Sequence, residues 1–227
     1  MSNCKARIND KKEINDMPDS IEFLIPEVKT SGKIDGLQFP DISDINFWKM
    51  YNNRIILLEE EIESWDYHIV KDIINFNRED VGIPTDQRKP IIILINSNGG
   101  LLDITLSICD AIKISKTPVY TVNMGMALSG ACLIFLMGEK RYAATSSWAM
   151  CHSGSGGMQG NYSETKEQSK VWDTQVKAMG SLIVERTGMD QKVYNKNKNK
   201  DWYLNQEQQL EYNFATDKLE DFDILFE

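Results

Sequence analysis

The chain has 227 residues, of which 41% are hydrophobic and 26% charged, and its formal net charge is −9. This composition is typical of a soluble globular protein long enough to bury a full core, and not of a disordered or membrane-embedded chain. Nucleic acid and anionic membranes attract cationic faces, so we expect neither as a partner of this acidic chain.

Residues 1–43 are charged and interrupted by prolines, among them Pro26 and Pro40, which predicts an N-terminal arm followed by one domain over 44–227. Residues 44–51 have the spacing of a short helix, and the apolar run 54–58 suits a buried strand. An amphipathic helix is predicted over 62–76. Its apolar positions recur at steps of three and four, at Ile62, Trp65, Ile69, Ile73 and Phe76.

The middle of the chain alternates between strands and helices. Residues 90–96 form an apolar run of the kind buried on both faces of a parallel sheet, and Gly99–Gly100 is expected to end that strand. The next strand is predicted over 118–123, and the next helix over 129–137, stopped at Gly138. Between the predicted strands 90–96 and 118–123 we expect another helix, with one apolar stripe made of Leu102, Leu106, Cys109 and Ile112.

Two further strands, 140–144 and 148–152, and a long helix from about 164 to 186 complete the pattern. Glycines crowd 154–160, and Gly188 is expected to end the long helix. The apolar face of that helix carries Val171, Trp172, Val176, Met179 and Ile183. Strands and helices in alternation predict an α/β fold with a mostly parallel sheet.

The chain has only two histidines, which limits the choice of a general base, because imidazole is the side chain that titrates near pH 7. His68 lies on the predicted amphipathic helix, where a surface or packing role fits it best. His152 ends a predicted strand and opens onto small residues, where α/β folds place ligands and catalytic groups. From this pattern alone, a strand-end histidine bonded to the backbone fits equally well.

Ser129 stands among small residues between a predicted strand and an apolar helix. Free N–H groups and the helix dipole favour developing negative charge at such a helix start, but serine is also a preferred N-cap. After the buried strand, Gly99 and Gly100 allow the backbone to approach another group closely and to aim an amide into a site. A simple strand-to-helix turn explains them as well, and no phosphate-binding GxxxxGK[ST] pattern is present.

In order and spacing, these segments resemble the Clp protease proteolytic subunit (ClpP) family from Arg54 to Leu219. Segments 54–58, 90–100 and 125–131 resemble that family's RIIFL strand, PIxLYINSPGG segment and GxAASMGA segment. Segments 148–152, 185–188 and 201–208 resemble its SRVMIH strand, the end of its long helix and its DRFLSAEEA segment.

The resemblance implies a serine endopeptidase with no cofactor and no metal. Ser129 would be the nucleophile, His152 the base and Asp201 the carboxylate that orients the base. The amides of Gly100 and Gly130 would form the oxyanion hole. As partners of the base, three other carboxylates rank below Asp201: Asp173, Asp190 and Asp217.

The fold implied by the resemblance is the ClpP/crotonase-like superhelix of repeated ββα units, with a protruding strand–helix handle at about 154–186. The family assembles as heptameric rings that stack in pairs, so the resemblance implies a homo-oligomer, peptide or unfolded-protein substrates and an AAA+ unfoldase partner. Lys200 replaces an arginine involved in ring contacts, Asn98 replaces a proline, Gly130 a methionine, and Ser153–Gly154 a Gln-Pro pair. Because lysine lacks the planar fork of arginine, we expect ring contacts to depend more on the apolar stripe of the long helix.

Three alternatives share the superfold. A crotonase-like acyl-CoA enzyme also builds an oxyanion hole from two amides, but it needs no Ser-His-Asp set. A phage-type capsid maturation protease would carry the same triad, and the divergent N-terminal arm is compatible with it. An inactive paralogue that only completes a mixed ring is disfavoured by the presence of all three triad residues.

The cysteine pattern and the N-terminus predict the compartment. Cys4, Cys109, Cys132 and Cys151 form no CxxC pair, which disfavours both a zinc site and a disulfide scaffold. The N-terminus has no apolar stretch of the signal-peptide kind, and no run reaches the roughly 18 apolar residues that a membrane-spanning helix needs. We therefore expect a soluble cytoplasmic protein.

Overall fold

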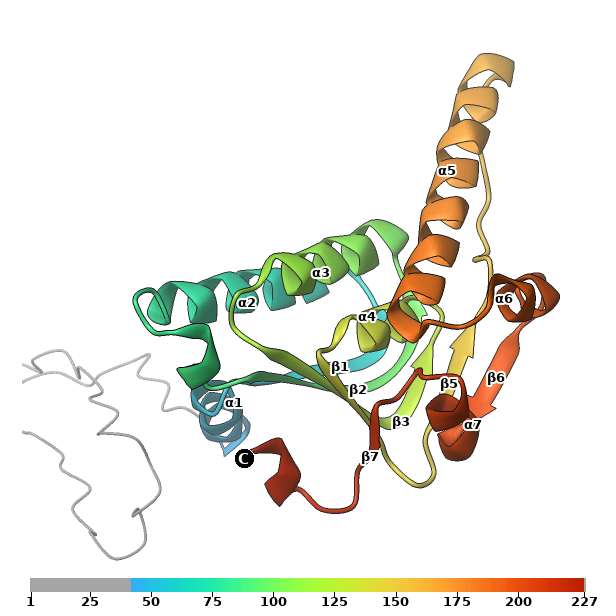
Figure 1. Cartoon of the computed structure of the whole chain (residues 1–227). Helices are drawn as coiled ribbons and strands as arrows, with labels where there is room; N and C mark the ends of the chain where they lie inside the picture. The colour runs from blue at the N-terminus through green and yellow to red at the C-terminus, as the bar shows by residue number, and fades with distance from the viewer. Residues whose placement is uncertain (1–41, 227) are drawn as a thin grey trace, which may run out of the picture. The chain divides into compact units, whose positions relative to one another are not determined.

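The computed structural model describes residues 42–226 of the chain (Figure 1). It divides into two compact units, Met1–Asn53 and Arg54–Glu227. The predicted N-terminal arm, up to residue 41, lies outside the described residues. In the first unit, helix α1 (Ile42–Asn52) confirms the short helix predicted over 44–51. Its aromatic rings contact one another, with centroids 5.6 Å apart for Phe47–Trp48 and 5.8 Å for Trp48–Tyr51.

The second unit is built on one sheet, in which the order β1-β2-β3-β4-β7 is extended by β5 beside β3 and by β6 beside β5. Every pairing is parallel except β5 with β6. The mostly parallel sheet predicted from the sequence is therefore confirmed. The strands are β1 (Ile55–Ile62), β2 (Ile91–Gly100), β3 (Val119–Leu128), β4 (Lys140–Ala143), β5 (Trp148–Cys151), β6 (Trp202–Asn205) and β7 (Asp217–Lys218).

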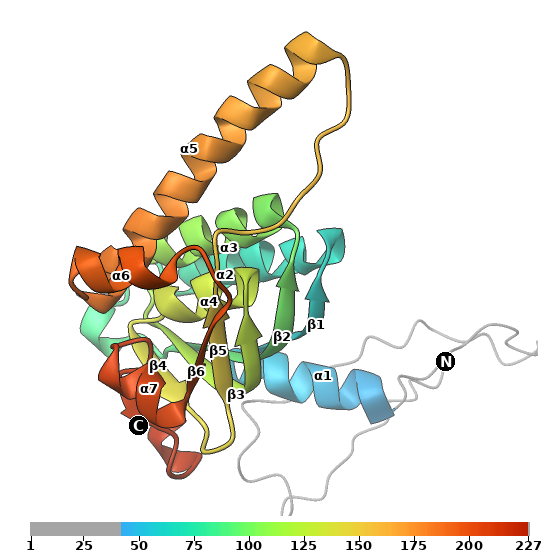
Figure 2. The ribbon, with the colours of Figure 1, turned by 90° about the vertical axis from the view of Figure 1, so that its right-hand side faces the viewer.

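Helices α2, α3 and α4 gather on one face of this sheet, and α5 projects away from it (Figures 1 and 2). All eight residues of α4 are buried, so this short helix is enclosed on every side. Within residues 42–226, no helix is both long and apolar enough to cross a membrane. The helices are α2 (His68–Glu79), α3 (Leu102–Ile114), α4 (Gly130–Met137), α5 (Tyr162–Thr187), α6 (Gln191–Asn197) and α7 (Gln206–Glu211), with 3-10 turns at Ser64–Tyr67, Thr85–Gln87 and Asp223–Leu225.

The centre of the core is β2, which is buried on both faces as its continuous apolar run predicted. Ile91, Ile93 and Ile95 are fully buried. On the other face of the strand, Ile92 joins a second cluster to which the C-terminal turn contributes Leu225. Burying both faces is what a parallel strand requires.

Two predicted boundaries differ from the structure around β1 and β2. β2 does not break at the glycines but continues through Gly100, which pairs with Ile62 of β1 beyond a register shift at which Asn98 of β2 has no partner in β1. Ile62 therefore belongs to a strand and not to the amphipathic helix predicted over 62–76. Trp65, also assigned to that helix, is 68% exposed in a 3-10 turn, and α2 begins only at His68. The predicted three-and-four spacing ran across three elements: β1, the 3-10 turn and α2.

Helix α3 confirms the predicted helix and half of its predicted apolar stripe. Cys109 and Ile112 of that stripe are buried, whereas Leu102 and Leu106 are only half-buried. Thr105 and Ile108, which the stripe did not include, are fully buried. The inner face of α3 accommodates a threonine because the Thr105 hydroxyl donates to Leu101 O at 2.9 Å within its own helix.

Helix α5 confirms the predicted long helix. It starts with a capping box between Asn161 and Glu164 and ends at Gly188, whose φ is 68°. Its buried residues lie in its C-terminal half, whereas Val171 is 58% exposed and Val176 half-buried. Residues 152–161 form no strand, so the predicted strand–helix handle is here a helix reached through an irregular segment.

Two arginine side chains clamp the C-terminal end of α4, where the last helical carbonyls have no partner within the helix. Arg186 on α5 donates from Nε to Leu136 O at 2.8 Å and from Nη2 to Gly138 O at 2.7 Å. Arg141 on β4 donates from Nη1 to Gly138 O at 3.2 Å. Burial, assisted by the charge of Arg186, lowers the pKa of Arg141 to about 10, so it is a cation at neutral pH.

Candidate active site

Ser129 lies at the junction of β3 and α4 in a backbone conformation that is rare for a side-chain-bearing residue, with φ 52° and ψ −118°. Such conformations cost about 1–3 kcal/mol and persist where the surroundings enforce them. Here the Ser129 amide donates to Met150 O at 2.8 Å. The hydroxyl makes no capping bond to α4, so the N-cap explanation of this serine is wrong. Its Oγ instead lies 2.7 Å from His152 Nε2.

His152 follows the last residue of β5. One of its ring nitrogens contacts Ser129 Oγ, and the other faces a carboxylate. Its Nδ1 lies 3.4 Å from Asp201 Oδ1, and its side chain is 19% exposed. The other histidine has a local structural role, because His68 Nδ1 lies 3.0 Å from Trp65 O at the start of α2. The structure therefore brings the predicted base, and not His68, to the serine.

The position of Asp201 follows from the antiparallel register of β5 and β6. In that register Cys151 pairs with Trp202, so the preceding and following residues, Asp201 and His152, face each other. The 3.4 Å separation exceeds the usual 2.7–3.2 Å range of an N–H···O hydrogen bond, and the Asp201 side chain is 62% exposed. The carboxylate is thus placed for an ion pair with a charged imidazole but is well solvated.

The lower-ranked carboxylates have other positions. Asp190 caps α6, where its Oδ1 accepts from the Lys192 amide at 2.6 Å. Asp173 is exposed on α5, and Asp217 is exposed on β7.

The glycine pair at the end of β2 packs directly against the serine turn. A side-chain carbon on Gly99, whose φ is 86°, would lie 2.7 Å from both Ser129 Cβ and the Gly130 nitrogen. One on Gly100 would overlap the carbonyl oxygen of Ile62. The chain therefore requires glycine at both positions because neighbouring backbone leaves no space.

Two backbone amides are the predicted donors of an oxyanion hole beside Ser129. Gly130 is the first residue of α4, where N–H groups have no partner within the helix. The Leu101 amide donates to Ile62 O at 2.9 Å, and successive N–H groups of an extended strand point to opposite sides. The same alternation predicts that the Gly100 N–H points away from β1. Ser129's own amide is occupied by Met150 O.

Two buried thiols lie close to the site but are poor nucleophiles. Burial raises the pKa of Cys151, the residue before His152, to about 12. Burial also raises the pKa of Cys132, in the first turn of α4, well above its usual value. Within residues 42–226, no group of three or more His, Cys, Asp or Glu side chains is placed to hold a metal ion.

Sequence patterns did not reveal two buried amides on the elements that carry the site, Asn123 and Gln209, whose side chains bond to each other at 3.1 Å. The only sequence signal was that Asn123, a polar residue, ends the apolar run 118–123, and this position suggested the end of a strand. The strand in fact continues to Leu128.

Comparisons with known proteins agree with this architecture. A family model described as Clp protease matches residues 42–220. The ATP-dependent Clp protease proteolytic subunit 2 of Treponema denticola is 32% identical over 167 residues, which cover 72% of this chain and 80% of that protein. The protein of the same name from Treponema pallidum is 29% identical over 178 residues, covering 77% and 86%. Among solved structures, a ClpP1 point mutant from Listeria monocytogenes shares the fold, with a TM-score of 0.68 and 24% identity over 79% of this chain and 99% of that one.

Proposed function

The chain belongs to the Clp protease family of serine peptidases, and from that premise we propose that Ser129, His152 and Asp201 hydrolyse peptide bonds as a catalytic triad. The observation that carries the proposal is the 2.7 Å contact between Ser129 Oγ and His152 Nε2, made by a serine that does not cap its own helix. Membership of this family leaves the acyl-CoA alternative without support.

The proposed reaction begins when Ser129 Oγ attacks a substrate carbonyl while His152 Nε2 takes its proton. The carbonyl oxygen becomes an oxyanion, for which we propose the amides of Gly100 and Gly130 as donors. One such donor contributes about 10²- to 10³-fold in rate. His152 then returns the proton to the leaving amine, and a water activated by the same histidine hydrolyses the acyl-enzyme.

Asp201 would stabilise the imidazolium that forms on His152 and hold the tautomer in which Nε2 accepts the serine proton. Its 3.4 Å separation from Nδ1 and its exposure mean that water screens part of this interaction. We therefore propose that Asp201 contributes less here than a fully buried carboxylate would.

We further propose that the chain works as a cytoplasmic homo-oligomer of heptameric rings on peptide or unfolded-protein substrates. The relatives named above are proteolytic subunits of ATP-dependent proteases, which supports an ATP-hydrolysing unfoldase as the partner of this chain. The projecting helix α5, with Val171 exposed, supports contact with other copies through this element.

A fluorophosphonate probe, which reacts with an activated serine, tests the assignment directly. The wild type is expected to be labelled once, at Ser129, and to cleave a fluorogenic peptide. Ser129→Ala should lose both properties while keeping its circular dichroism and particle size. Hydrolysis by Ser129→Ala near the wild-type rate would exclude the proposed nucleophile.

A further inference from the structure

Two buried amide side chains join the strands that carry the proposed triad. Asn123 lies on β3 and Gln209 on α7, and both residues are 0% exposed. Asn123 Nδ2 donates to Gln209 Oε1 at 3.1 Å. We call this pair, Asn123 and Gln209, the amide bridge.

The amide bridge lies where β3 changes its neighbour in the sheet. β3 pairs with β4 as far as Asn123 and with β5 only from Met126 onward. Across this gap, Asn123 Nδ2 also donates to the carbonyl oxygen of Trp148, the first residue of β5, at 3.0 Å. Its Oδ1 accepts from the Gly125 amide at 3.3 Å. A side chain thus connects β3 to β5 where the backbone ladder is interrupted.

Gln209 extends the connection from β5 to β6. Its Nε2 donates to Ser147 O at 3.1 Å, just before β5, and to Leu204 O in β6 at 3.2 Å. It also lies 3.4 Å from the Ser147 hydroxyl oxygen. The amide bridge therefore links three strands that come from distant parts of the chain.

Each of these strands ends or begins beside one member of the proposed triad. β3 ends one residue before Ser129, β5 ends one residue before His152, and β6 begins one residue after Asp201. Sliding any of the strands along its neighbour would change the distances among these side chains, and a misplacement of about 1 Å can cost about 10²-fold in rate. We propose that Asn123 and Gln209 are positioning residues that fix the register of the three strands and so align the triad. This inference rests on the proposed catalytic function.

The test compares Gln209→Met, which keeps the length of the side chain but removes its donors and acceptor, with the wild type on a fluorogenic peptide. We expect kcat to fall at least about 30-fold while KM stays within about twofold, because substrate binding does not use Gln209 and proton transfer uses the aligned triad. The rate of fluorophosphonate labelling of Ser129 should fall in parallel with kcat.

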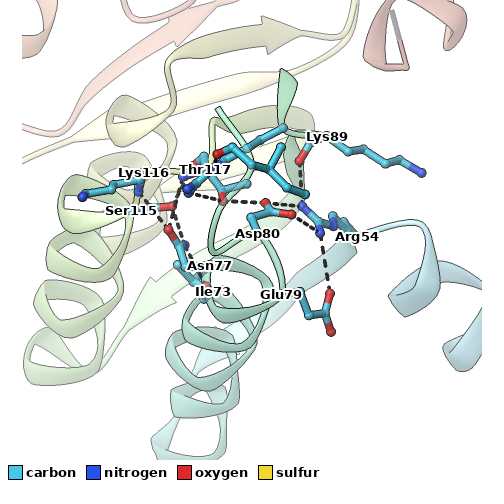
Figure 3. A network of polar contacts seen from close by, with 11 residues as sticks. Arg54, Ile73, Asn77, Glu79, Asp80, Lys89, Ser115, Lys116 and Thr117 are labelled. Atoms are coloured by element: carbon cyan, nitrogen blue, oxygen red, sulfur yellow. Dashed lines mark hydrogen bonds and ion pairs between the residues drawn. The ribbon is translucent and has the colours of Figure 1, made fainter. Parts of the chain in front are cut away.

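Asn77 offers a matched control (Figure 3). Its amide also makes four hydrogen bonds, to Ile73 O, the Ser115 hydroxyl and the amides of Lys116 and Thr117. These bonds hold the loop before β3, whereas Ser129 follows the other end of that strand. With 10 residues in β3, the two ends are about 30 Å apart. Asn77→Ala should therefore lower Tm, as Gln209→Met does, but leave kcat within about twofold.

The inference is overturned if Gln209→Met keeps kcat within twofold of the wild type, or if the two variants lose kcat in proportion to their loss of Tm. If Gln209→Met does not fold, Gln209→Asn carries the test, because its shorter amide cannot reach Asn123 and Ser147 together. A tenfold lower kcat at unchanged KM is then expected, and an unchanged kcat overturns the inference. Absence of Ser129-dependent labelling in the wild type would instead refute the proposed function itself.

Discussion

Gly99 lies in contact with the serine turn, so that a single added carbon on it would come within 2.7 Å of Ser129 Cβ. The end of β2 and the start of α4 therefore share one tightly packed junction. Any displacement of Gly99 must also displace Ser129.

Gly99→Ala should reduce kcat/KM by at least about 100-fold and lower Tm, because alanine at φ 86° is strained and its methyl group would push the serine turn away from His152. Gly157→Ala is the control, since nothing lies within 4 Å of the position that its methyl group would occupy. Steady-state kinetics and differential scanning calorimetry measure both effects. Normal activity in Gly99→Ala would contradict the role assigned to this junction.

His152→Ala should abolish hydrolysis, whereas His68→Ala should retain nearly all of it. The reason is geometric, because His152 Nε2 lies 2.7 Å from Ser129 Oγ, whereas His68 Nδ1 contacts Trp65 O. The measurement is kcat/KM of both variants on one peptide substrate. If His68→Ala is the inactive variant, the wrong histidine has been named as the base.

Asp201→Asn should lower kcat by about 10²-fold, less than the loss in His152→Ala. In proteases with a buried triad carboxylate the corresponding loss is about 10⁴-fold, but here the carboxylate is 62% exposed and 3.4 Å from Nδ1. The measurement is kcat for both variants on one substrate. Equal losses would show that Asp201 is held more tightly during the reaction than in this structure.

Asp80→Asn should destabilise the fold by about 3 kcal/mol at neutral pH, the scale for removing one partner of a buried ion pair. Two hydrogen bonds of 2.7 Å from Arg54 hold the pKa of Asp80 below its usual range, against the opposing effect of burial (Figure 3). A lowered folded-state pKa contributes stability that is fully present above the unfolded value of about 3.9 and is lost as pH falls through the folded value.

Denaturant unfolding of Asp80→Asn and wild type should therefore differ by a constant amount above about pH 5 and converge below about pH 4. Glu79→Gln is the control, because Glu79 lies 3.6 Å from Arg54 and its side chain is 57% exposed, which limits its effect to less than about 1 kcal/mol. If the stability difference between Asp80→Asn and wild type grows toward acid pH, the folded-state pKa of Asp80 is not lowered as described.

Val176→Asp should weaken the proposed assembly. Val176 is half-buried on the projecting helix α5, five residues after the exposed Val171, and a buried carboxylate in a subunit contact is costly. Thr174→Asp, at an exposed position of the same helix, is the matched control. Sedimentation velocity should show smaller particles for Val176→Asp alone, at all salt concentrations. If Val176→Asp forms particles of the same size as the wild type, α5 does not make the proposed subunit contact.

Much of the fold was predictable because its central strands and helices have continuous or periodic apolar patterns. The run 90–96 identified a doubly buried strand, and Gly188 marked the end of α5. The region after Gly188 was not predictable from pattern alone. β6 has four residues, and it forms because Trp202 pairs with Cys151 far upstream, a contact that no local spacing reveals.

The residues of the candidate site were predictable only through the family resemblance. Resemblance selected Ser129, His152, Asp201, Gly100 and Gly130, whereas their local patterns had equally good structural explanations. For Ser129 the geometry favours the catalytic explanation over the helix-capping one, because its hydroxyl contacts His152 and not the helix. The positions of Asn123 and Gln209 could not be inferred, because buried amides satisfy one another only once β3, β5 and α7 have come together.

The arginine clamp on α4 has a mechanical consequence. Ser129 occupies one end of a rigid rod of eight residues, about 12 Å long, whose far end is gripped by Arg186. Arg186 sits near the base of α5, and the other end of α5 reaches away from the sheet (Figure 2). The base of α5 and the helix that begins beside Ser129 are thus joined through one side chain, so a displacement of that base would act first on the C-terminal end of α4.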